Sequence, residues 1–416
     1  MKVIVAHPGK QHSYRLASAL KKSNYLKRYV TTLYNKKNNW FLKILRYILS
    51  NDNKKRANGR INHDLDDEDV HLIGQIGGYI EALLYRLDKK RTFYRYVREF
   101  DSKIFGIKLA RYAIAQKVDA LICYDSNAEV CFNRLKKYGS DIKRIMDVSI
   151  AARPYMKSIY DLEISRSGHD DLKYENSYMW RPSRLNKSYL EIEDTQFFLV
   201  ASNFVKDSLV YCGVNPKQIK IVPYGANVES NINRYVLPPN TRIEFLFVGQ
   251  VVYRKGITYL LESMKSFESC KAHLTVTGSY NSSDWFVKEN LNKSNISFTG
   301  LVTIDKMRAI YEKSHVFVLP SFAEGMAQVG IEAMACGLPV ICTYNSGVAD
   351  LVSDGVNGFI VPVGDKQVLE EKMQWFIDHP DKILEMGEAA RKVASNYSWS
   401  DYERRVVKAI NEIMEN

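Results

Sequence analysis

The sequence predicts an α/β protein with two doubly wound, Rossmann-like domains that face each other across a cleft. Short apolar strands alternate with helical segments in both halves of the 416-residue chain. Many of these strands are continuous hydrophobic runs, as in parallel sheets that helices cover on both faces. The length is also sufficient for two domains. Ligands of such sheets bind beyond the carboxyl ends of the strands, so we expect a site in the cleft.

The alternation of strands and helices is clearest in the second half of the chain. We expect helices over 257–267 and 304–313, and a third helix that ends at Gly337. The pattern predicts strands over 244–249, 272–278, 296–300, 315–320, 339–342 and 359–363. Repeated strand–helix units of this kind are typical of a parallel sheet.

The first half of the chain repeats the pattern less regularly. Strands are expected over 2–6, 27–33, 118–123, 144–147 and 197–201, with a helix over 14–22 and a long, basic, aromatic-rich insertion over 35–100. We place an N-terminal domain over 1–226, a linker over 227–241 and a C-terminal domain over 242–399. Val406, Ile410 and Ile413 share one face of a C-terminal helix over 400–416, which we expect to pack back onto the first domain.

Charge divides the chain into two unlike halves. Residues 1–220 hold 40 basic and 24 acidic side chains, and the remaining 196 hold 19 and 23, within a net charge of +12. The first half is therefore expected to face an anionic partner. No C-x-x-C pair, secretion signal or long apolar run is present, which predicts a cytoplasmic protein without structural zinc.

The most informative motif begins at the end of an expected buried strand. Glu324 and Gly325 precede a helical segment that contains Glu332 among apolar neighbours. If the whole interval were helical, eight residues would separate the two carboxylates by about 12 Å along the axis. They therefore cannot share a proton, but they can accept hydrogen bonds from two ends of an extended, hydroxyl-rich ligand.

A second motif follows the first strand of the same half. Gly249 ends an apolar run, and Arg254 and Lys255 precede a glycine and a helical segment. Because parallel strands end at one edge of a sheet, this basic turn is expected to lie beside Glu324, where it suits a diphosphate.

Together these motifs resemble the retaining glycosyltransferases of family 4, which have the GT-B architecture. The resemblance is densest over 222–362. It implies that the domain over 1–226 is the acceptor-side domain and that the domain over 242–399 is the nucleotide-sugar-binding domain. It implies that Glu324 lies beside the donor sugar, that Glu332 binds the ribose hydroxyls, and that Arg254 and Lys255 bind the donor diphosphate. It also implies that the backbone of the following residues contacts sugar and phosphate: Gly325, Met326, Ala327 and Gln328.

The sequence departs from the family pattern at three places. Gln250 stands where many members have arginine, Met326 and Ala327 replace Phe-Gly, and Ala152 occupies the position of an expected histidine. The identity of the donor sugar therefore does not transfer from the family.

Further candidates follow strands of the first half. Gly9 and Lys10 suit a loop that reaches the phosphates. Asp125 and Asp147 suit contacts to acceptor hydroxyls, although turn or capping roles fit them equally well. The acidic run over 64–69 follows no apolar strand, so we interpret it as a solvated loop rather than a metal site.

The resulting hypothesis is a hexosyltransferase that uses a UDP- or GDP-sugar, with no metal and no other cofactor. A lipid-linked glycan of bacterial lipopolysaccharide, O-antigen or capsule is the acceptor expected by analogy. A basic nucleic-acid-binding protein and a nicotinamide-dependent oxidoreductase are the alternatives. The sequence lacks nucleic-acid recognition motifs and a G-x-G-x-x-G fingerprint, so we expect no nucleic-acid partner.

A final candidate lies within the basic insertion. Trp40, Phe41, Ile44, Leu45 and Ile48 share one face of an expected helix, and basic residues flank it. This pattern suits a helix that lies on an anionic membrane surface, here the cytoplasmic face of the inner membrane, through residues 36–56. The alternative is an ordinary helix that packs against the core.

Overall fold

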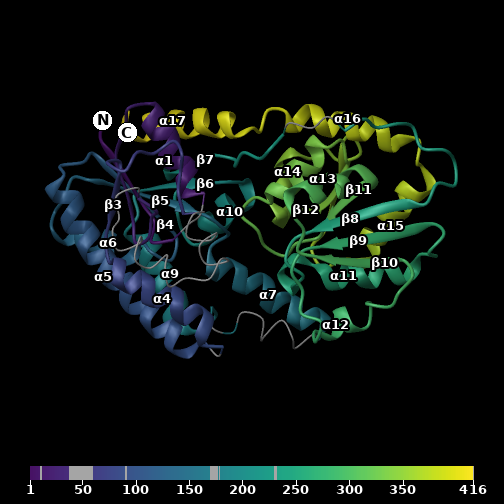
Figure 1. Cartoon of the computed structure of the whole chain (residues 1–416), viewed down its shortest axis with the longest axis horizontal. Coiled ribbons are helices and arrows are strands. Elements are labelled where there is room, and N and C mark those ends of the chain that lie inside the picture. Colours follow the sequence, from purple (N-terminus) through teal and green to yellow (C-terminus); the bar gives the residue numbers. More distant parts are fainter. Residues whose placement is uncertain are drawn as a thin grey trace.

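Two parallel β-sheets organise the chain, and helices cover both of them (Figure 1). The structure is a computed structural model that describes residues 1–9, 12–36, 60–89, 91–168, 177, 179–228 and 232–415. Seven strands form the first sheet and six form the second. The predicted α/β class with two doubly wound domains is confirmed.

The N-terminal sheet has the strand order β3-β2-β1-β4-β5-β6-β7, with every neighbouring pair parallel. The order reverses direction between β1 and β4, which creates a switch point at the carboxyl ends of these strands. The strands are β1 (Val3–Ala6), β2 (Leu26–Thr31), β3 (Val70–Leu72), β4 (Ala120–Tyr124), β5 (Lys143–Val148), β6 (Phe197–Val200) and β7 (Ile219–Ile221).

The C-terminal sheet has the order β10-β9-β8-β11-β12-β13 and is also parallel throughout. Its switch point lies between β8 and β11. All four residues of β11 are fully buried, as its continuous apolar sequence predicts. The strands are β8 (Ile243–Val248), β9 (Ala272–Thr277), β10 (Ile296–Gly300), β11 (Val316–Leu319), β12 (Val340–Thr343) and β13 (Gly358–Val361).

The helices follow the strands in the order expected of doubly wound sheets. In the N-terminal domain they are α1 (Ser13–Lys22), α4 (Gln75–Leu87), α5 (Thr92–Ala115), α6 (Glu129–Lys137), α7 (Arg153–Ser167), α9 (Pro182–Glu193) and α10 (Asn203–Tyr211). In the C-terminal half they are α11 (Ile257–Ser263), α12 (Trp285–Lys288), α13 (Ile304–Lys313), α14 (Gln328–Ala335), α15 (Lys366–Asp378), α16 (Lys382–Ala394) and α17 (Trp399–Glu415).

The segment interpreted as an insertion is in part a component of the sheet domain. β3 pairs with β2 at the sheet edge, and the helices α4 and α5 follow it. Three strand residues are too few to give a periodic signal in the sequence. Most of the proposed membrane helix over 36–56 lies outside the described residues.

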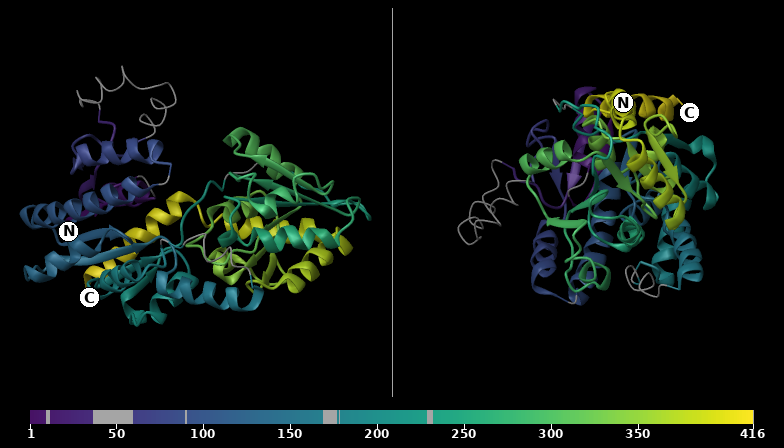
Figure 2. Two further views of the ribbon diagram at one scale, coloured as in Figure 1. Left: turned by 90° about the horizontal axis from the view of Figure 1, so that it is seen from below. Right: turned by 90° about the vertical axis from the view of Figure 1, so that its right-hand side faces the viewer.

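Helix α17 returns from the C-terminal domain to the N-terminal one (Figure 2). Its Val406, Ile410 and Ile413 are fully buried, which reflects their spacing of three and four residues. Glu403 pairs with Lys22 of α1 at 2.8 Å, and the Ile413 carbonyl accepts a bond from Lys143 Nζ at 2.9 Å. The helix therefore packs on the N-terminal domain.

Polar contacts also join the two domains near the cleft. The hydroxyl of Tyr344 donates to Asp207 at 2.5 Å, and the hydroxyl of Tyr259 donates to Glu163 of α7. No helix within the described ranges has both the length and the hydrophobicity needed to cross a membrane.

Candidate active site

The basic turn after β8 and the acidic turn after β11 meet at the switch point of the C-terminal sheet. Glu324 Oε1 lies 2.7 Å from Arg254 Nη1 and 2.6 Å from Lys255 Nζ. Arg254 Nη1 also donates to the carbonyl of Ala323 at 2.6 Å. Glu324 is 9% exposed, so its charge is held by two cations rather than by bulk water. The three candidate catalytic residues thus form one cluster.

Close backbone packing brings these two turns together. Gly256 follows the basic turn with φ +67°, and a Cβ on it would lie 1.9 Å from the carbonyl oxygen of Pro320. Phe322 N also donates to the carbonyl of Arg254 at 2.8 Å. Only glycine satisfies both the left-handed conformation and the lack of space. The Arg-Lys-Gly sequence therefore has a structural reason as well as an electrostatic one.

Glu332 lies apart from this cluster, on helix α14. Its Oε2 accepts a bond from the hydroxyl of Tyr311 on α13 at 3.3 Å. Burial raises the pKa of Glu332, and the bond from Tyr311 opposes part of that rise. The two glutamates therefore have different partners and different environments, as their spacing predicts. The Tyr311 contact has no sequence signal, because it depends on how α13 packs against α14.

Gly325 lies at a tight backbone contact between the domains. A Cβ on this residue would lie 2.0 Å from the carbonyl oxygen of Ser149, which follows β5 in the N-terminal domain. Ser202, the N-cap of α10, donates through its hydroxyl to the carbonyl of Gly325 at 2.6 Å. The acidic turn is therefore fixed against the opposite domain. Ser149 and Ser202 were not predicted from the sequence, because their contacts with Gly325 depend on how the two domains are arranged.

The other residues of the two motifs line the same region. Gly249 directly follows β8, and a Cβ on it would lie 3.5 Å from Lys255 Cε. Met326 and Ala327 are buried, and Gln328 is the first residue of α14. The N–H of Ala327 donates to the Ser346 carbonyl at 3.2 Å, so it is already engaged within the domain.

The N-terminal domain places its candidates at its own switch point. Asp147 at the end of β5 is buried, and its Oδ1 lies 3.1 Å from His12 Nε2. Asp125 follows β4, and its Oδ1 accepts a bond from Ser149 N at 2.9 Å. The N–H of Gly9 lies 2.9 Å from His7 Nδ1. Lys10 lies outside the described residues.

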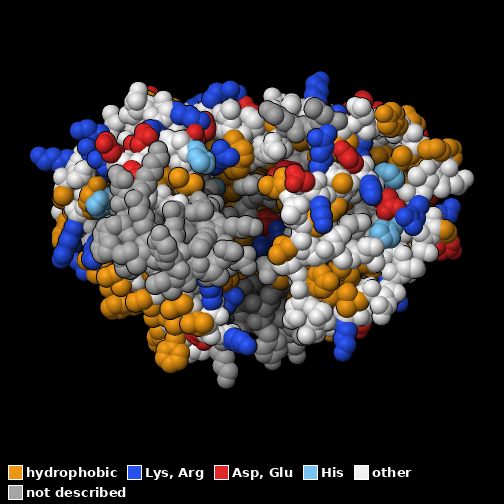
Figure 3. Space-filling model, in the orientation of Figure 1, with side chains coloured by type: hydrophobic (Ala, Val, Ile, Leu, Met, Phe, Trp, Pro, Cys, Tyr) orange, Lys and Arg blue, Asp and Glu red, His pale blue; other side chains and the backbone are white. Residues whose placement is uncertain are grey.

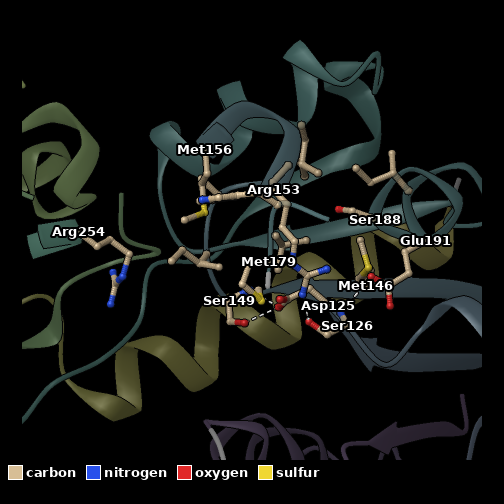
Figure 4. A pocket seen from close by; sticks show the side chains of 17 residues that line it. Asp125, Ser126, Met146, Ser149, Arg153, Met156, Met179, Ser188, Glu191 and Arg254 are labelled. Carbon is tan, nitrogen blue, oxygen red and sulfur yellow. Dashed lines mark hydrogen bonds between the residues drawn. The ribbon is translucent and has the colours of Figure 1, made fainter. Parts of the chain in front are cut away.

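A pocket of about 290 Å³ opens between the domains beside this switch point (Figure 4). Asp125, Ser149 and Arg153 face it from the N-terminal side, and Arg254 faces it from the opposite side. Arg153 donates to the hydroxyl of Ser126, and its Nε is buried without a partner. The remaining lining residues are Met146, Val148, Ile150, Ala151, Ala152, Met156, Met179, Trp180, Ser188, Glu191, Ile192 and Leu209. Asp147 is not among them.

The pocket combines polar groups with an apolar wall. Glu191 accepts bonds from the N–H groups of Ser126 and Ala128 at 3.0 and 3.1 Å, which engages both of its oxygens. Burial raises its pKa. Arg153 and Glu191 were not identified as site residues from the sequence, because neither is part of a recognisable motif. Taken together, fold and cleft define a two-domain protein with a basic turn opposite a partly polar pocket.

Comparisons with known proteins agree with this geometry. Residues 229–393 match the sequence profile of the family described as Glycosyl transferases group 1. An uncharacterized glycosyltransferase of Methanocaldococcus jannaschii is 28% identical over 318 residues, which are 72% of this chain and 76% of that protein. The capsular polysaccharide biosynthesis glycosyltransferase CapM of Staphylococcus aureus is 33% identical over 159 residues, which are 36% of this chain and 40% of CapM.

Solved structures extend the likeness to the whole chain. HepE of Anabaena, in complex with UDP, superposes with a TM-score of 0.62 at 13% identity and covers 99% of this chain and 100% of its own. At that identity the likeness concerns the fold, which is GT-B. The sequence matches and this fold support a GT-B glycosyltransferase.

Proposed function

We propose that the chain is a retaining hexosyltransferase that moves a sugar from a UDP- or GDP-sugar to a glycan acceptor. One observation carries this proposal: a carboxylate held by two cations at the switch point of the C-terminal sheet. Arg254 and Lys255 supply the charge that a diphosphate requires, and Glu324 supplies an acceptor for sugar hydroxyls. The Anabaena relative in complex with UDP supports a uridine nucleotide as the first ligand to test.

Donor binding is expected to rearrange this cluster. A diphosphate carries more charge than one carboxylate, so it competes with Glu324 for Arg254 Nη1 and Lys255 Nζ, which now lie 2.7 and 2.6 Å from Glu324 Oε1. Glu324 is then released from the cations and accepts hydrogen bonds from the donor sugar. In the free protein, Glu324 thus occupies the cations that the donor needs.

The nucleoside is expected to lie against α14. Glu332 is half-buried and accepts one bond from Tyr311, which leaves acceptor capacity on its carboxylate. Two adjacent ribose hydroxyls are suitable donors for this group. The separation of the two glutamates along the motif lets one hold the ribose while the other reaches the sugar.

The transfer step follows from this placement. The acceptor oxygen attacks the anomeric carbon on the face from which the diphosphate leaves, and the bond from that carbon to the phosphate oxygen breaks. A departing phosphate oxygen takes the acceptor proton, so the configuration is retained. Arg254 and Lys255 stabilise the charge that develops on the leaving group, without a metal ion.

The acceptor is proposed to occupy the pocket of the N-terminal domain. Trp180 and the methionines offer apolar contact, while Asp125 and Arg153 offer hydrogen bonds to hydroxyls. The role of CapM in capsular polysaccharide biosynthesis supports a bacterial surface glycan as the acceptor. A lipid-linked glycan at the cytoplasmic face of the membrane is the specific form that we propose.

Ligand binding followed by product analysis tests the proposal. In a thermal-shift screen of UDP, GDP and NAD, we expect UDP or GDP to raise the melting temperature and NAD to leave it unchanged. The nucleotide that binds then selects the α-linked sugar donor for an activity assay. NMR of the product is expected to show an α-linkage. Stabilisation by NAD alone would contradict the assignment, and a β-linked product would contradict retention.

A further inference from the structure

Helices α4 and α5 expose an unusual concentration of large apolar side chains. Among the described residues, 25 large hydrophobic side chains are exposed, and eight of them lie between residues 76 and 100. Each of the eight is between 45% and 76% exposed: Ile76, Ile80, Leu83, Tyr85, Leu87, Phe93, Tyr96 and Phe100. Scattered exposed hydrophobic residues are ordinary, but a contiguous group is typical of an interaction surface.

The positions of these residues place them in two stripes. At 100° per residue, Ile76, Ile80, Leu83 and Leu87 fall on one side of α4. Phe93, Tyr96 and Phe100 fall on one side of α5. Figure 3 shows the apolar side chains gathered at the lower left of the molecule, over these two helices. We call this group the α4–α5 surface.

The α4–α5 surface is not the margin of the protein core. Helix α5 buries a different set of residues, Phe105, Leu109, Ala110 and Ala113, in the core of the N-terminal domain. Within α4 the only fully buried residue is Gly78. The stripes of α4 and of the first half of α5 therefore stay exposed among the residues that the structure describes, so another molecule can cover them.

Basic side chains surround the stripes. Residues 75–103 contain seven basic and four acidic side chains. Three of the acids are engaged within the protein: Glu81 lies 3.8 Å from Arg98, Glu99 lies 3.3 Å from Arg184, and Asp88 accepts a bond from Tyr94 N.

Exposed cations remain beside the apolar side chains. Arg86, Lys89 and Lys103 are exposed, and the guanidinium of Arg91 lies over the ring of Tyr85, 4.5 Å from its centroid. Apolar stripes with aromatic residues and flanking cations are the combination that binds an anionic lipid surface.

We propose that the α4–α5 surface docks the enzyme onto an anionic lipid bilayer. The stripes insert among the acyl chains and headgroups, and the cations contact lipid phosphates. A second copy of this chain is a poorer occupant, because two such surfaces would bring their cations together. The proposal does not depend on the transferase reaction, and it rests on other residues than the segment over 36–56 considered above.

Vesicle flotation of the full-length protein tests the proposal. The vesicles contain phosphatidylglycerol and phosphatidylcholine, or phosphatidylcholine alone, at low and high salt. We expect the wild type to float only with the anionic vesicles at low salt, because the Debye length falls from about 30 Å at 0.01 M to about 3 Å at 1 M. The variant Leu83→Ser/Phe93→Ser/Phe100→Ser is expected to lose flotation.

The matched control is Leu301→Ser/Ile304→Ser, which removes two exposed apolar side chains from the C-terminal domain and is expected to float like the wild type. UDP binding by the triple variant verifies that it is folded and separates this test from that of the proposed function. Flotation of the triple variant at the wild-type level would overturn the proposal. So would loss of flotation only in Trp40→Ser/Phe41→Ser, or a wild-type dimer that the triple variant converts to a monomer.

Discussion

Gly325 packs directly against the carbonyl oxygen of Ser149, which a Cβ on Gly325 would approach to 2.0 Å. One residue belongs to the N-terminal domain and the other follows the β11 strand of the C-terminal domain. The hydroxyl of Ser202 also bonds to the Gly325 carbonyl at 2.6 Å. We therefore expect the position of the acidic turn that carries Glu324 to depend on this contact between the domains.

Gly325→Ala tests this dependence. The added methyl group would force the domains apart, because the atom that it meets is backbone. A displacement of about 1 Å at a reacting centre costs roughly a hundredfold in rate, so we expect kcat/KM to fall by about that factor. Affinity for UDP, measured by calorimetry, should be preserved because its proposed contacts lie within the C-terminal domain. Wild-type turnover would show that this closure is not needed.

The hydroxyl bonds of Tyr259 and Tyr344 across the domain interface are expected to hold the closed arrangement. Tyr259→Phe/Tyr344→Phe removes both donors and leaves Glu163 and Asp207 without them. Small-angle scattering of the free protein should then give a larger radius of gyration. Tyr138→Phe is the control, because it removes an exposed hydroxyl at the end of α6 that takes no part in these two bonds. It should leave the radius of gyration unchanged. An unchanged radius in the double variant would contradict the role of these bonds.

Glu332 offers a test that depends on pH. Burial raises its pKa in the folded protein above the unfolded value, so the folded state binds the proton more tightly. Proton binding by Glu332 therefore stabilises the folded state. This contribution is fully present below the pKa of the unfolded state and is lost as pH rises through the pKa of the folded state. Glu332→Gln should therefore unfold at a higher temperature than the wild type at neutral pH, and the difference should shrink as pH falls to about 4.

The same variant should bind nucleotide less well. A neutral amide is a weaker acceptor for ribose hydroxyls than a carboxylate, so we expect UDP affinity to fall by roughly tenfold. A variant that is more stable than the wild type but binds UDP less tightly indicates that Glu332 serves ligand binding at a cost in stability. Unchanged UDP affinity together with lower stability would instead assign Glu332 a structural role.

Much of the fold could be predicted because its strands are short, apolar and regularly spaced. The strand β11 (Val316–Leu319) is a continuous buried run that lies within the predicted strand over 315–320, and the same pattern identified the turn that follows it. The edge strand β3 was missed because three residues carry no periodicity. The helix α4 and the first half of α5 were missed because many of their apolar residues are exposed, where sequence patterns are ordinarily polar.

The site could be predicted most fully within the C-terminal domain, although Asp125 of the N-terminal domain was also predicted and lines the pocket. Glu324, Arg254 and Lys255 follow neighbouring strands, so parallel-sheet geometry brings them together. The contact of Gly325 with Ser149 depends on the relative placement of two domains, which no local spacing encodes. The partner of Glu332 likewise depends on the packing of two helices. Long-range packing is the information that a single sequence leaves out.

We propose above that Arg254 and Lys255 release Glu324 and bind the donor diphosphate in its place. Calorimetric titration of UDP into three variants tests it directly. Removing a buried, hydrogen-bonded charge costs about 2–5 kcal/mol, so Lys255→Ala should weaken UDP binding by roughly thirtyfold or more. The exposed Lys265, 3.8 Å from Glu289, gives the control Lys265→Ala, which should bind UDP like the wild type.

Glu324→Gln is the decisive variant in this titration. Because the amide no longer competes for the two cations, the variant should bind UDP at least as tightly as the wild type, while its turnover falls by about a hundredfold. Weaker UDP binding by Glu324→Gln, to the level of Lys255→Ala, would contradict the exchange. Wild-type affinity in Lys255→Ala would contradict the site itself.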